Sequence, residues 1–390
     1  MQEPRKIVLI LGNGFDLGLG LKTSYKDFWE SEYCPKDYPA PLIRYLNETL
    51  GKGIEKVRWY DLENELYNYY RQIAEGSRDR DIITSTEQQF LIHFDPHIVS
   101  RLHYSRYEKE INSLIEKGIV FVDSGFQVYM DVPYLEDLRK DPVSRDKEAL
   151  LCIKKGLCEY LKGLDYFQTI KNAVSDEGRP PMPFSVLQMA IDAGKHGCGL
   201  DIFSFNYTNL LPYIPDHQIM GEWMHYIHGR CETGDIIIGT RDDVDISEEY
   251  DFLYKSFAPG FNPQSIVPAL RDAQEVIVFG HSLGENDQQY FKDFFAKQTV
   301  YGDTVSKNIT IFTKDDESVI ETKRALRKMT NNRLSNLSAL NNLKIIKTTG
   351  TPTEEEAAEL GSFFNEFESN YLNGHGEVYG VNNGYVWSKR

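Results

Sequence analysis

Polar and glycine residues follow several short apolar runs of the sequence, at the points where strands are expected to end. The first such corner comes directly after the apolar run 6–11, and it holds Gly12, Asn13, Gly14, Phe15 and Asp16. Later corners hold Asn206, His228 and the segment Gly280, His281, Ser282 and Leu283. In open parallel sheets, ligands bind beyond the carboxyl ends of the strands. We therefore expect these corners to form one ligand-binding site.

The glycine-rich first corner could bring a backbone close to a phosphate group. Glycine permits a tight strand-to-helix turn and leaves backbone amides open to an anion. In the dinucleotide-binding fingerprint a third glycine and a later acidic residue are required, but here that glycine falls one residue late, at Gly18. No clear acidic residue ends a second strand about 20 residues further on. This departure argues against an ordinary dehydrogenase and leaves nucleotide binding or a simple tight turn.

Each of the remaining corners has more than one interpretation. Asn206 and His228 could cap loops, since a buried polar side chain must find a partner or cost about 1–3 kcal/mol. The segment 280–284 matches the G-x-S-x-G pattern of serine hydrolases, in which Ser282 would be the nucleophile. The catalytic histidine must follow the serine in that class, and here only His375 does. A serine hydrolase is therefore the third class of function considered.

A metal site is not expected. His93, Asp95, His97 and His103 lie close in sequence, but Pro96 interrupts the helix that would place His93 and His97 on one face.

Composition excludes several classes of protein. The net charge is −16, which argues against binding to nucleic acid or to an anionic membrane. No apolar stretch approaches the roughly 20 residues that a membrane span needs. The short apolar run near the start leads into Gly-Asn-Gly, unlike a signal peptide. Five scattered cysteines without a C-x-x-C pair are typical of reduced thiols, so we expect a cytoplasmic protein.

The apolar runs predict the fold class. Runs that are apolar at nearly every position suit strands buried on both faces of a parallel sheet. They cover residues 6–11, 201–205, 224–227, 235–238, 275–279, 308–312 and 343–346. We expect an α/β fold with a doubly wound, mostly parallel, Rossmann-like sheet and a large helical insertion. The expected parts are a core of residues 1–35 and 196–350, an insertion of residues 36–195, and a C-terminal helix and flexible tail of residues 351–390.

Local patterns predict several elements in more detail. Leu62, Leu66, Tyr69 and Tyr70 have the spacing of one helix face, and so do Leu150, Ile153, Leu157 and Leu161. Residues 119–122 and 126–130 could pair as a hairpin. The segment Thr351-Pro352-Thr353-Glu354 predicts a capping box, with Thr351 as the N-cap and Glu354 three residues later.

Several segments of the chain closely resemble the AbiH family of bacterial abortive-infection proteins. The opening Leu-Gly-Asn-Gly-Phe-Asp-Leu of residues 11–17 and the segment 20–28 resemble the signature of that family. Residues 59–63 and 203–208 are similar to later segments of the family. The resemblance implies a role in defence against bacteriophage.

The order of the corners is also similar to that of the sirtuin-like superfamily, which implies NAD as the ligand. On this resemblance, Gly12, Asn13, Gly14 and Phe15 would cradle the pyrophosphate. Ser282 and the amides of Gly280, His281 and Leu283 would contact the adenosine side.

The same resemblance implies roles for three catalytic residues. Asn206 would orient a water molecule or the ribose hydroxyls, His228 would hydrogen-bond the ribose and accept a proton, and Asp16 would bind ribose hydroxyls or the nicotinamide end. Sirtuins have an acidic residue two positions after the asparagine, where this chain has Thr208. The four-cysteine zinc module of sirtuin deacylases is absent from the sequence, so the resemblance favours NAD hydrolysis over protein deacylation.

The functional expectation is an abortive-infection protein that hydrolyses NAD to nicotinamide and ADP-ribose. The alternative is a non-catalytic switch that senses NAD or ADP-ribose. A protein that destroys NAD must be restrained, so we expect regulation through a homo-oligomer or a regulatory protein partner.

Overall fold

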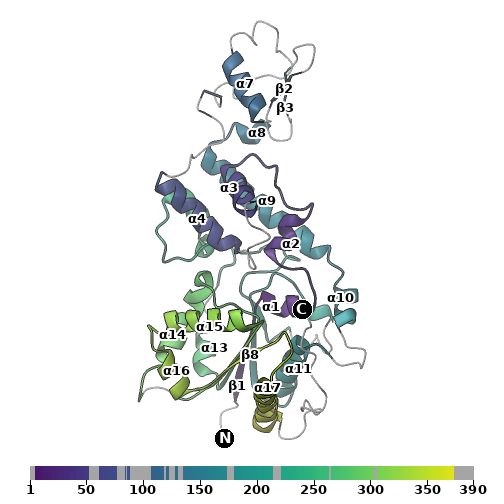
Figure 1. The fold of residues 1–390 in the computed structure, drawn as a ribbon, viewed down its shortest axis with the longest axis vertical. Coiled ribbons are helices and arrows are strands. Elements are labelled where there is room, and N and C mark those ends of the chain that lie inside the picture. The colour runs from purple at the N-terminus through teal and green to yellow at the C-terminus, as the bar shows by residue number, and fades with distance from the viewer. Residues whose placement is uncertain are drawn as a thin grey trace. The chain divides into compact units, whose positions relative to one another are not determined.

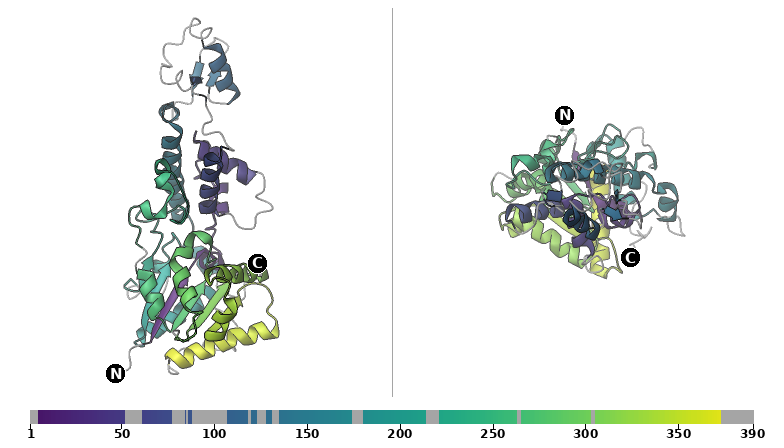
Figure 2. Two further views of the ribbon diagram at one scale, coloured as in Figure 1. Left: turned by 90° about the vertical axis from the view of Figure 1, so that its left-hand side faces the viewer. Right: turned by 90° about the horizontal axis from the view of Figure 1, so that it is seen from above.

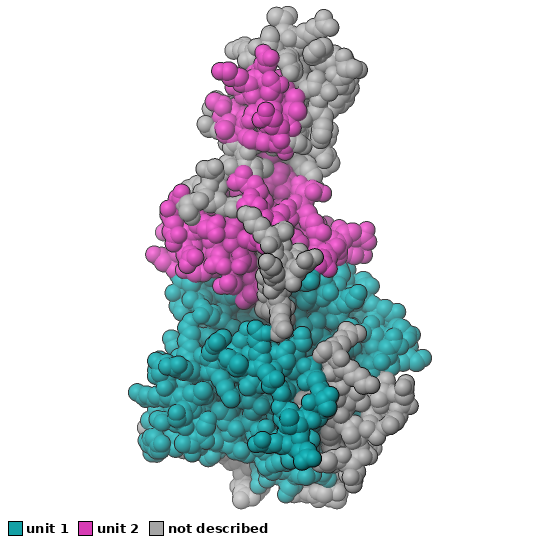
Figure 3. Space-filling model, viewed as in Figure 1, with its two compact units in different colours: residues 1–28, 158–244, 254–390 teal, residues 29–157, 245–253 magenta. Residues whose placement is uncertain are grey.

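The computed structural model describes most of the chain (Figure 1). The described residues are 5–51, 61–76, 84, 86–87, 107–117, 120–122, 128–130, 135–173, 180–213, 221–262, 265–302 and 305–372. Two compact units divide the chain (Figure 3). The first, called the sheet unit, comprises residues 1–28, 158–244 and 254–390, and the second, called the helical unit, comprises residues 29–157 and 245–253.

A six-stranded parallel sheet forms the centre of the sheet unit, so the chain has an α/β fold. Its strands are β1 (Lys6–Leu11), β4 (Gly199–Ser204), β5 (Met224–Tyr226), β6 (Glu275–Phe279), β7 (Asn308–Thr313) and β8 (Asn342–Lys347). Their order across the sheet is β5-β4-β1-β6-β7-β8, and all neighbouring pairs are parallel. The carboxyl ends of all six strands therefore lie at one edge, with β1 and β6 side by side in the middle.

The central strands are buried on both faces, as their apolar sequences predict. Residues of β1 alternate between two hydrophobic cores, with Ile7 and Leu9 in one and Val8 and Ile10 in the other. The first core is filled by α11 (Met182–Lys195) and α17 (Glu354–Phe367), and the second by α13 (Ile266–Asp272), α14 (Gln288–Lys297), α15 (Asp316–Met329) and α16 (Leu334–Leu340). Helices thus cover both faces of the sheet (Figures 1 and 2).

One predicted strand is not formed. Residues 235–238 carry three buried isoleucines but adopt no strand. Instead Ile237 N donates to His228 O at 2.8 Å, so this segment folds back on the corner after β5. A loop that is buried also needs apolar residues, so the apolar pattern did not distinguish this loop from a strand.

The helical unit contains most of the predicted insertion. Its described elements are α3 (Pro41–Gly51), α4 (Leu62–Ala74), α7 (Glu108–Glu116), α8 (Leu135–Leu138), η3 (Glu248–Leu253), the hairpin strands β2 (Val120–Val122) and β3 (Val128–Met130), and most of α9 (Pro142–Lys162). The predicted α4 stripe is confirmed, because Leu62, Leu66, Tyr69 and Tyr70 are all buried. The predicted hairpin is also confirmed, since β2 and β3 pair antiparallel. Helix α11 lies inside the predicted insertion, 36–195, but packs in the sheet unit.

A buried carboxylate ties the helical unit together. Asp146 of α9 accepts hydrogen bonds from Leu42 N at 2.8 Å and from the Tyr69 hydroxyl at 2.5 Å. The Tyr250 hydroxyl donates to the same carboxylate at 3.5 Å. Asp146 therefore joins α9 to α3, α4 and η3.

The capping box of α17 lies two residues after its predicted position. Thr353 is the N-cap: its hydroxyl accepts from Glu356 N at 3.2 Å, and the Glu356 carboxylate accepts from Thr353 N at 2.9 Å. Both threonines of the segment have a glutamate three residues later, so the pattern alone was ambiguous. The observed start places Glu354, Glu355 and Glu356 in the first turn, where the helix dipole favours negative charge.

Candidate functional site

Four predicted corners lie at the carboxyl edge of the sheet. They follow β1, β4, β5 and β6, and β4 pairs with β5 so that Ser204 lies opposite Tyr226. Asn206 and His228 each lie two residues beyond this pair, so the register brings them to neighbouring positions at the edge. The aromatic rings that flank Asn206 in sequence both contact the His228 ring, with centroids 5.1 Å away for Phe205 and 6.2 Å for Tyr207.

The first group of polar residues, called the Asn206 cluster, consists of Asp16, Asn206 and Thr208. Asn206 Nδ2 donates to Asp16 Oδ1 at 2.9 Å and to Gly12 O at 3.1 Å. The Thr208 hydroxyl donates to Asp16 Oδ2 at 2.6 Å. All three side chains are buried. The predicted residues Asp16 and Asn206 therefore meet, and Thr208 completes their network.

The carbonyl oxygen of Asn206 is the unsatisfied atom of this cluster. It is buried, and among the described residues it has no hydrogen-bond partner. Both hydrogens of the amide nitrogen are already directed to Gly12 and Asp16, which fixes the orientation of the amide. A buried acceptor without a donor costs about 1–3 kcal/mol. The atom is therefore suited to accept a hydrogen bond from a ligand or a water molecule.

Asp16 titrates near neutral pH. Burial raises the pKa of its carboxyl group to about 7, while the hydrogen bonds from Thr208 and Asn206 act in the opposite direction. Burial disfavours the ionised form because it removes water from the charge. Perturbed carboxyl groups of this kind are found at functional sites, although buried networks also produce them.

The second group, called the His228 cluster, consists of His228, Lys255, His281 and Asp287. Lys255 belongs to the short helix η4 (Lys255–Phe257), and Asp287 belongs to η6 (Glu285–Asp287). The Lys255 ammonium is 2.7 Å from Asp287 Oδ1 and 3.3 Å from His228 Nε2. His228 Nε2 lies 3.2 Å from Asp287 Oδ1, and His281 Nε2 lies 3.3 Å from Asp287 Oδ2. Asp287 therefore contacts the other three members.

The electrostatics of this cluster keep His228 neutral at physiological pH. Burial and the adjacent Lys255 ammonium together lower the pKa of His228 to about 4, although Asp287 opposes the shift. Burial acts to raise the pKa of Asp287, but Lys255 and the hydrogen-bonding histidines hold it well below its ordinary value. The 3.2 Å contact between His228 Nε2 and Asp287 Oδ1 accordingly joins a neutral imidazole to a carboxylate.

Aromatic rings surround both histidines. The Phe205 ring lies edge-on to His228 and to His281, with centroids 5.1 and 4.4 Å away. Tyr290 of α14 contacts Phe205 and His228. This surrounding lowers the local dielectric constant, which strengthens the polar contacts inside it.

The glycines of the first corner pack directly on the last corner. Gly12 N donates to Phe279 O at 3.0 Å, and Gly14 N donates to Gly280 O at 2.8 Å. A Cβ atom on Gly14 would lie 2.6 Å from Gly280 Cα, and one on Gly12 would lie 2.5 Å from His281 Cα. The close packing of the two corners therefore requires glycine at both positions. The amides of Gly12 and Gly14 donate to these carbonyls, and Phe15 N donates to Gly12 O.

The last corner carries backbone strain. Leu283 has a φ angle of 52° although it is not glycine, and its side chain is fully buried. Such strained residues cluster at functional sites, where the surrounding structure holds them in place. His281 Nδ1 stabilises the turn by accepting from Leu283 N at 3.0 Å. Ser282 is exposed, and its hydroxyl accepts from Gly284 N at 3.2 Å.

Lys255 and Asp287 were missed by the sequence analysis. Asp287 lies four residues after Leu283 of the last corner, and no motif in the sequence assigns it a role. Lys255 lies in a segment without a strand pattern, so no spacing in the sequence connects it to His228. The one available signal was the run Glu285-Asn286-Asp287, which is polar where a buried helix start would favour small residues.

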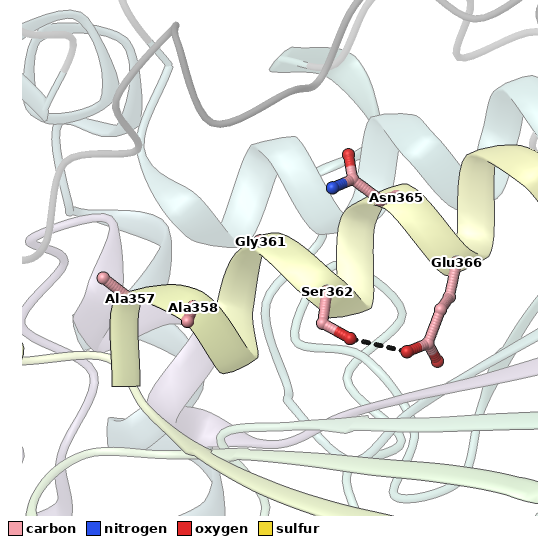
Figure 4. A pocket seen from close by; sticks show the side chains of 6 residues that line it. All are labelled: Ala357, Ala358, Gly361, Ser362, Asn365 and Glu366. Atoms are coloured by element: carbon pink, nitrogen blue, oxygen red, sulfur yellow. Dashed lines mark hydrogen bonds between the residues drawn. The ribbon is translucent and has the colours of Figure 1, made fainter. Parts of the chain in front are cut away.

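A surface cavity lies elsewhere in the sheet unit, along α17. It measures about 490 Å³ and is lined by Ala357, Ala358, Gly361, Ser362, Asn365 and Glu366 (Figure 4). The Ser362 hydroxyl donates to Glu366 within it, at 2.5 Å. None of these residues belongs to the four corners.

Two expectations concern residues or features outside the site. The histidines at 93, 97 and 103 lie outside the described residues. Among the described residues, no group of three or more histidine, cysteine or acidic side chains is arranged to hold a metal ion. No described helix combines the length and the apolar character needed to cross a membrane.

The fold and the corners define an α/β protein with a buried polar site at the carboxyl edge of a parallel sheet. Residues 8–307 match the family described as Bacteriophage abortive infection AbiH, so the chain belongs to the AbiH family. This membership gives the chain a role in bacteriophage abortive infection. A search of curated proteins found no match.

Proposed function

We propose that the chain acts in abortive infection by hydrolysing NAD to nicotinamide and ADP-ribose. The observation that carries this proposal is the buried, unpartnered carbonyl oxygen of Asn206 at the carboxyl edge of the sheet. It requires a hydrogen-bond donor, which the fully ionised pyrophosphate of NAD does not offer. Ribose hydroxyls, a carboxamide or a water molecule supply one. The ribose and nicotinamide end of NAD therefore belongs at Asn206.

The topology supports a dinucleotide ligand. Numbered in chain order, the six strands have the spatial order 3-2-1-4-5-6, which is the order of doubly wound dinucleotide-binding sheets. In those folds the ligand crosses the edge where the strand order reverses, which here lies between β1 and β6. The proposed fold type is thus a doubly wound, sirtuin-like Rossmann sheet, with the corners 12–15 and 280–283 as the walls of the NAD site.

The two clusters suggest how water would be directed at the substrate. A water molecule that donates one hydrogen to Asn206 Oδ1 and the other to His228 presents a lone pair to the anomeric carbon. The neutral state of His228 leaves it able to accept. The nicotinamide ring of NAD is cationic and leaves the ribose as a neutral molecule, so the reaction needs little acid assistance. The products are nicotinamide, ADP-ribose and one proton, and the protein contributes mainly orientation and electrostatic stabilisation.

The carboxylate of Asp16 supports the same reaction. It holds Asn206 in one orientation and is itself held by Thr208. In its ionised form it places negative charge beside the proposed ribose site, where an oxocarbenium-like transition state develops positive charge. Asp16, from the corner after β1, thus provides a carboxylate next to Thr208, the position at which sirtuins carry an acidic residue.

The test is NAD consumption by the purified protein, with free nicotinamide identified by proton NMR, in the presence and absence of extract from phage-infected cells. Asn206→Ala is expected to abolish release. Asn341→Ala is the matched control, because Asn341 is also an asparagine at 6% exposure, but its oxygen accepts from Lys307 N. Equal release by wild type and Asn206→Ala contradicts the proposal.

The second candidate function is a non-catalytic switch that senses NAD or ADP-ribose. The low pKa of His228, about 4, favours this candidate, because it makes the imidazole a weak base. Tight binding of NAD without nicotinamide release under either condition supports the switch. In either case control through a homo-oligomer or a regulatory protein partner is proposed, and size measurements with and without NAD test it.

A further inference from the structure

The His228 cluster contains a buried ion pair that the proposed reaction does not itself require. Lys255 is fully buried, and its ammonium is 2.7 Å from the Asp287 carboxylate. Burying two charges is costly unless the geometry and the surrounding hydrogen bonds are favourable. Here the pair contacts two histidines instead of being surrounded only by apolar side chains. The arrangement therefore suggests that the ion pair determines the tautomer and the protonation state of a histidine.

All contacts that the pair makes with His228 are at one ring nitrogen. Nε2 lies 3.2 Å from Asp287 Oδ1 and 3.3 Å from the Lys255 ammonium. Nδ1 makes no hydrogen bond within the described part of the chain. Because the hydrogen bond at one imidazole nitrogen fixes the tautomer, the pair determines what Nδ1 can do.

The second histidine of the cluster, His281, contacts the other oxygen of the Asp287 carboxylate. His281 Nδ1 accepts from Leu283 N, so in the neutral ring the hydrogen lies on Nε2. That Nε2 lies 3.3 Å from Asp287 Oδ2, and the carboxylate can only accept. Asp287 Oδ2 is therefore occupied by His281, which leaves Oδ1 for Lys255 and His228.

We infer that Asp287 and Lys255 are positioning residues that hold His228 with its hydrogen on Nε2 and its Nδ1 lone pair free for the substrate water. A hydrogen bond from Nε2–H to a carboxylate is charge-assisted and stronger than one between neutral groups. The opposite tautomer would accept a hydrogen bond from the Lys255 ammonium at 3.3 Å but would place the Nε2 lone pair 3.2 Å from a carboxylate oxygen, the closer of the two contacts. Lys255 keeps Asp287 ionised and disfavours the imidazolium, so the free nitrogen stays unprotonated. This role of Nδ1 rests on the proposed NAD hydrolysis, but the tautomer does not.

The groups that face His228 come from several elements. They are Lys255 of η4, Asp287 of η6, His281 of the last corner, Tyr290 of α14 and Tyr207 beyond β4. Of these, Lys255 and Asp287 carry full charges and act in opposite directions on the imidazolium. Removing one of them therefore exposes His228 to the other alone.

The test is nitrogen-15 NMR of the full chain labelled at histidine, in which long-range couplings report which ring nitrogen carries the hydrogen. His228→Gln identifies the signals. In wild type, His228 is expected with a protonated Nε2 and a bare Nδ1 at neutral pH. In Asp287→Asn, Lys255 remains to donate to Nε2, so the hydrogen is expected to move to Nδ1. In Lys255→Met the titration of His228 is expected at higher pH than in wild type.

The control variants are Glu275→Gln and Lys307→Met, which remove a buried carboxyl group and a buried lysine at the opposite edge of the sheet. Neither is expected to change the His228 signals. A wild-type His228 protonated on Nδ1, or an unchanged tautomer in Asp287→Asn, overturns the inference. The wild-type spectrum decides even if a variant does not fold.

Steady-state kinetics then test whether the tautomer of His228 affects the rate of NAD hydrolysis. Asp287→Asn is expected to lower kcat about 10–100-fold, as for other residues that orient a reacting group, with little change in KM. Absence of NAD cleavage by wild type with the expected tautomer rejects the proposed function and leaves the positioning intact. Normal kcat in Asp287→Asn with a switched tautomer rejects the role of Nδ1 alone.

Discussion

The Thr208 hydroxyl donates a hydrogen bond of 2.6 Å to Asp16 Oδ2, which links the corner after β4 to the corner after β1. In the proposed sirtuin-like site, Thr208 takes the position of an acidic residue. The structure places a carboxylate against it, supplied by a residue nearly two hundred positions earlier in the chain. The hydroxyl of Thr208 thus contacts a buried carboxylate that comes from a distant part of the sequence.

Replacing Thr208 by valine is expected to raise the pKa of Asp16 further above about 7, because the Thr208 hydrogen bond lowers it. Hydrogen bonds to charged groups are worth ~1.5–3 kcal/mol. Thr208→Val is therefore expected to lose more free energy of unfolding at pH 8, where Asp16 is ionised, than at pH 5. Thr208→Ser keeps the hydroxyl and is the control. Urea denaturation at several pH values measures the difference, and an equal loss at both pH values contradicts it.

The raised pKa of Asp16 predicts how stability changes with pH. A carboxyl group whose pKa is 3.8 in the unfolded state and about 7 in the folded state stays protonated to a higher pH in the folded protein. Its contribution to stability is complete below about pH 4 and is lost as the pH rises through 7. Asp16→Asn is expected to remove this dependence, so the variant gains relative to wild type by up to about 1.4 kcal/mol per pH unit in that range.

Glu275 provides an internal comparison for this prediction. Its pKa is also raised to about 7 by burial, and it lies at the start of β6, away from the four corners. Glu275→Gln is expected to show the same gain with rising pH as Asp16→Asn. Of the two, only Asp16→Asn is expected to impair nicotinamide release. A flat difference from wild type between pH 4 and 7 in both variants contradicts the prediction.

The packing of the first corner on the last predicts intolerance of a single methyl group. Gly14→Ala would place Cβ 2.6 Å from Gly280 Cα, a contact that backbone must move to relieve. The expected cost is about 1–3 kcal/mol, as for other overpacked sites. Gly221→Ala is the control, because no atom lies within 4 Å of its Cβ position. Thermal denaturation distinguishes the two, and equal stability shows that the corners are not in tight contact.

Ser282 distinguishes the proposed NAD site from a serine hydrolase. No described histidine is hydrogen-bonded to its hydroxyl, which instead accepts from Gly284 N. A fluorophosphonate probe is expected to leave Ser282 unlabelled. Ser282→Ala is expected to keep the kcat of nicotinamide release, and a raised KM agrees with its place on the adenosine side. Labelling at Ser282 that the alanine variant abolishes establishes the hydrolase.

The parts of the structure that depend on local pattern were predictable from the sequence. Buried parallel strands, the α4 stripe and the 120–130 hairpin follow from residues that are close in the chain. The meeting of Asp16 with Asn206 followed from the rule that strand ends share one edge. Lys255 was not predictable, because its contact with Asp287 depends on the path of a loop without periodic sequence. The prediction of a strand at 235–238 was wrong, because a buried loop requires the same apolar residues as a buried strand.

The position of β1 in the sheet has a consequence during synthesis of the chain. Its two neighbours are β4 and β6, so one of its edges stays without its native partner until residue 204 has left the ribosome, and the other until residue 279 has done so. At roughly 5–20 residues per second, the strand waits on the order of ten seconds or longer. The His228 cluster cannot assemble before that moment, because it needs His281 and Asp287, which follow β6 in the chain. An incomplete nascent chain therefore lacks the His228 cluster, which the proposed NAD hydrolysis requires.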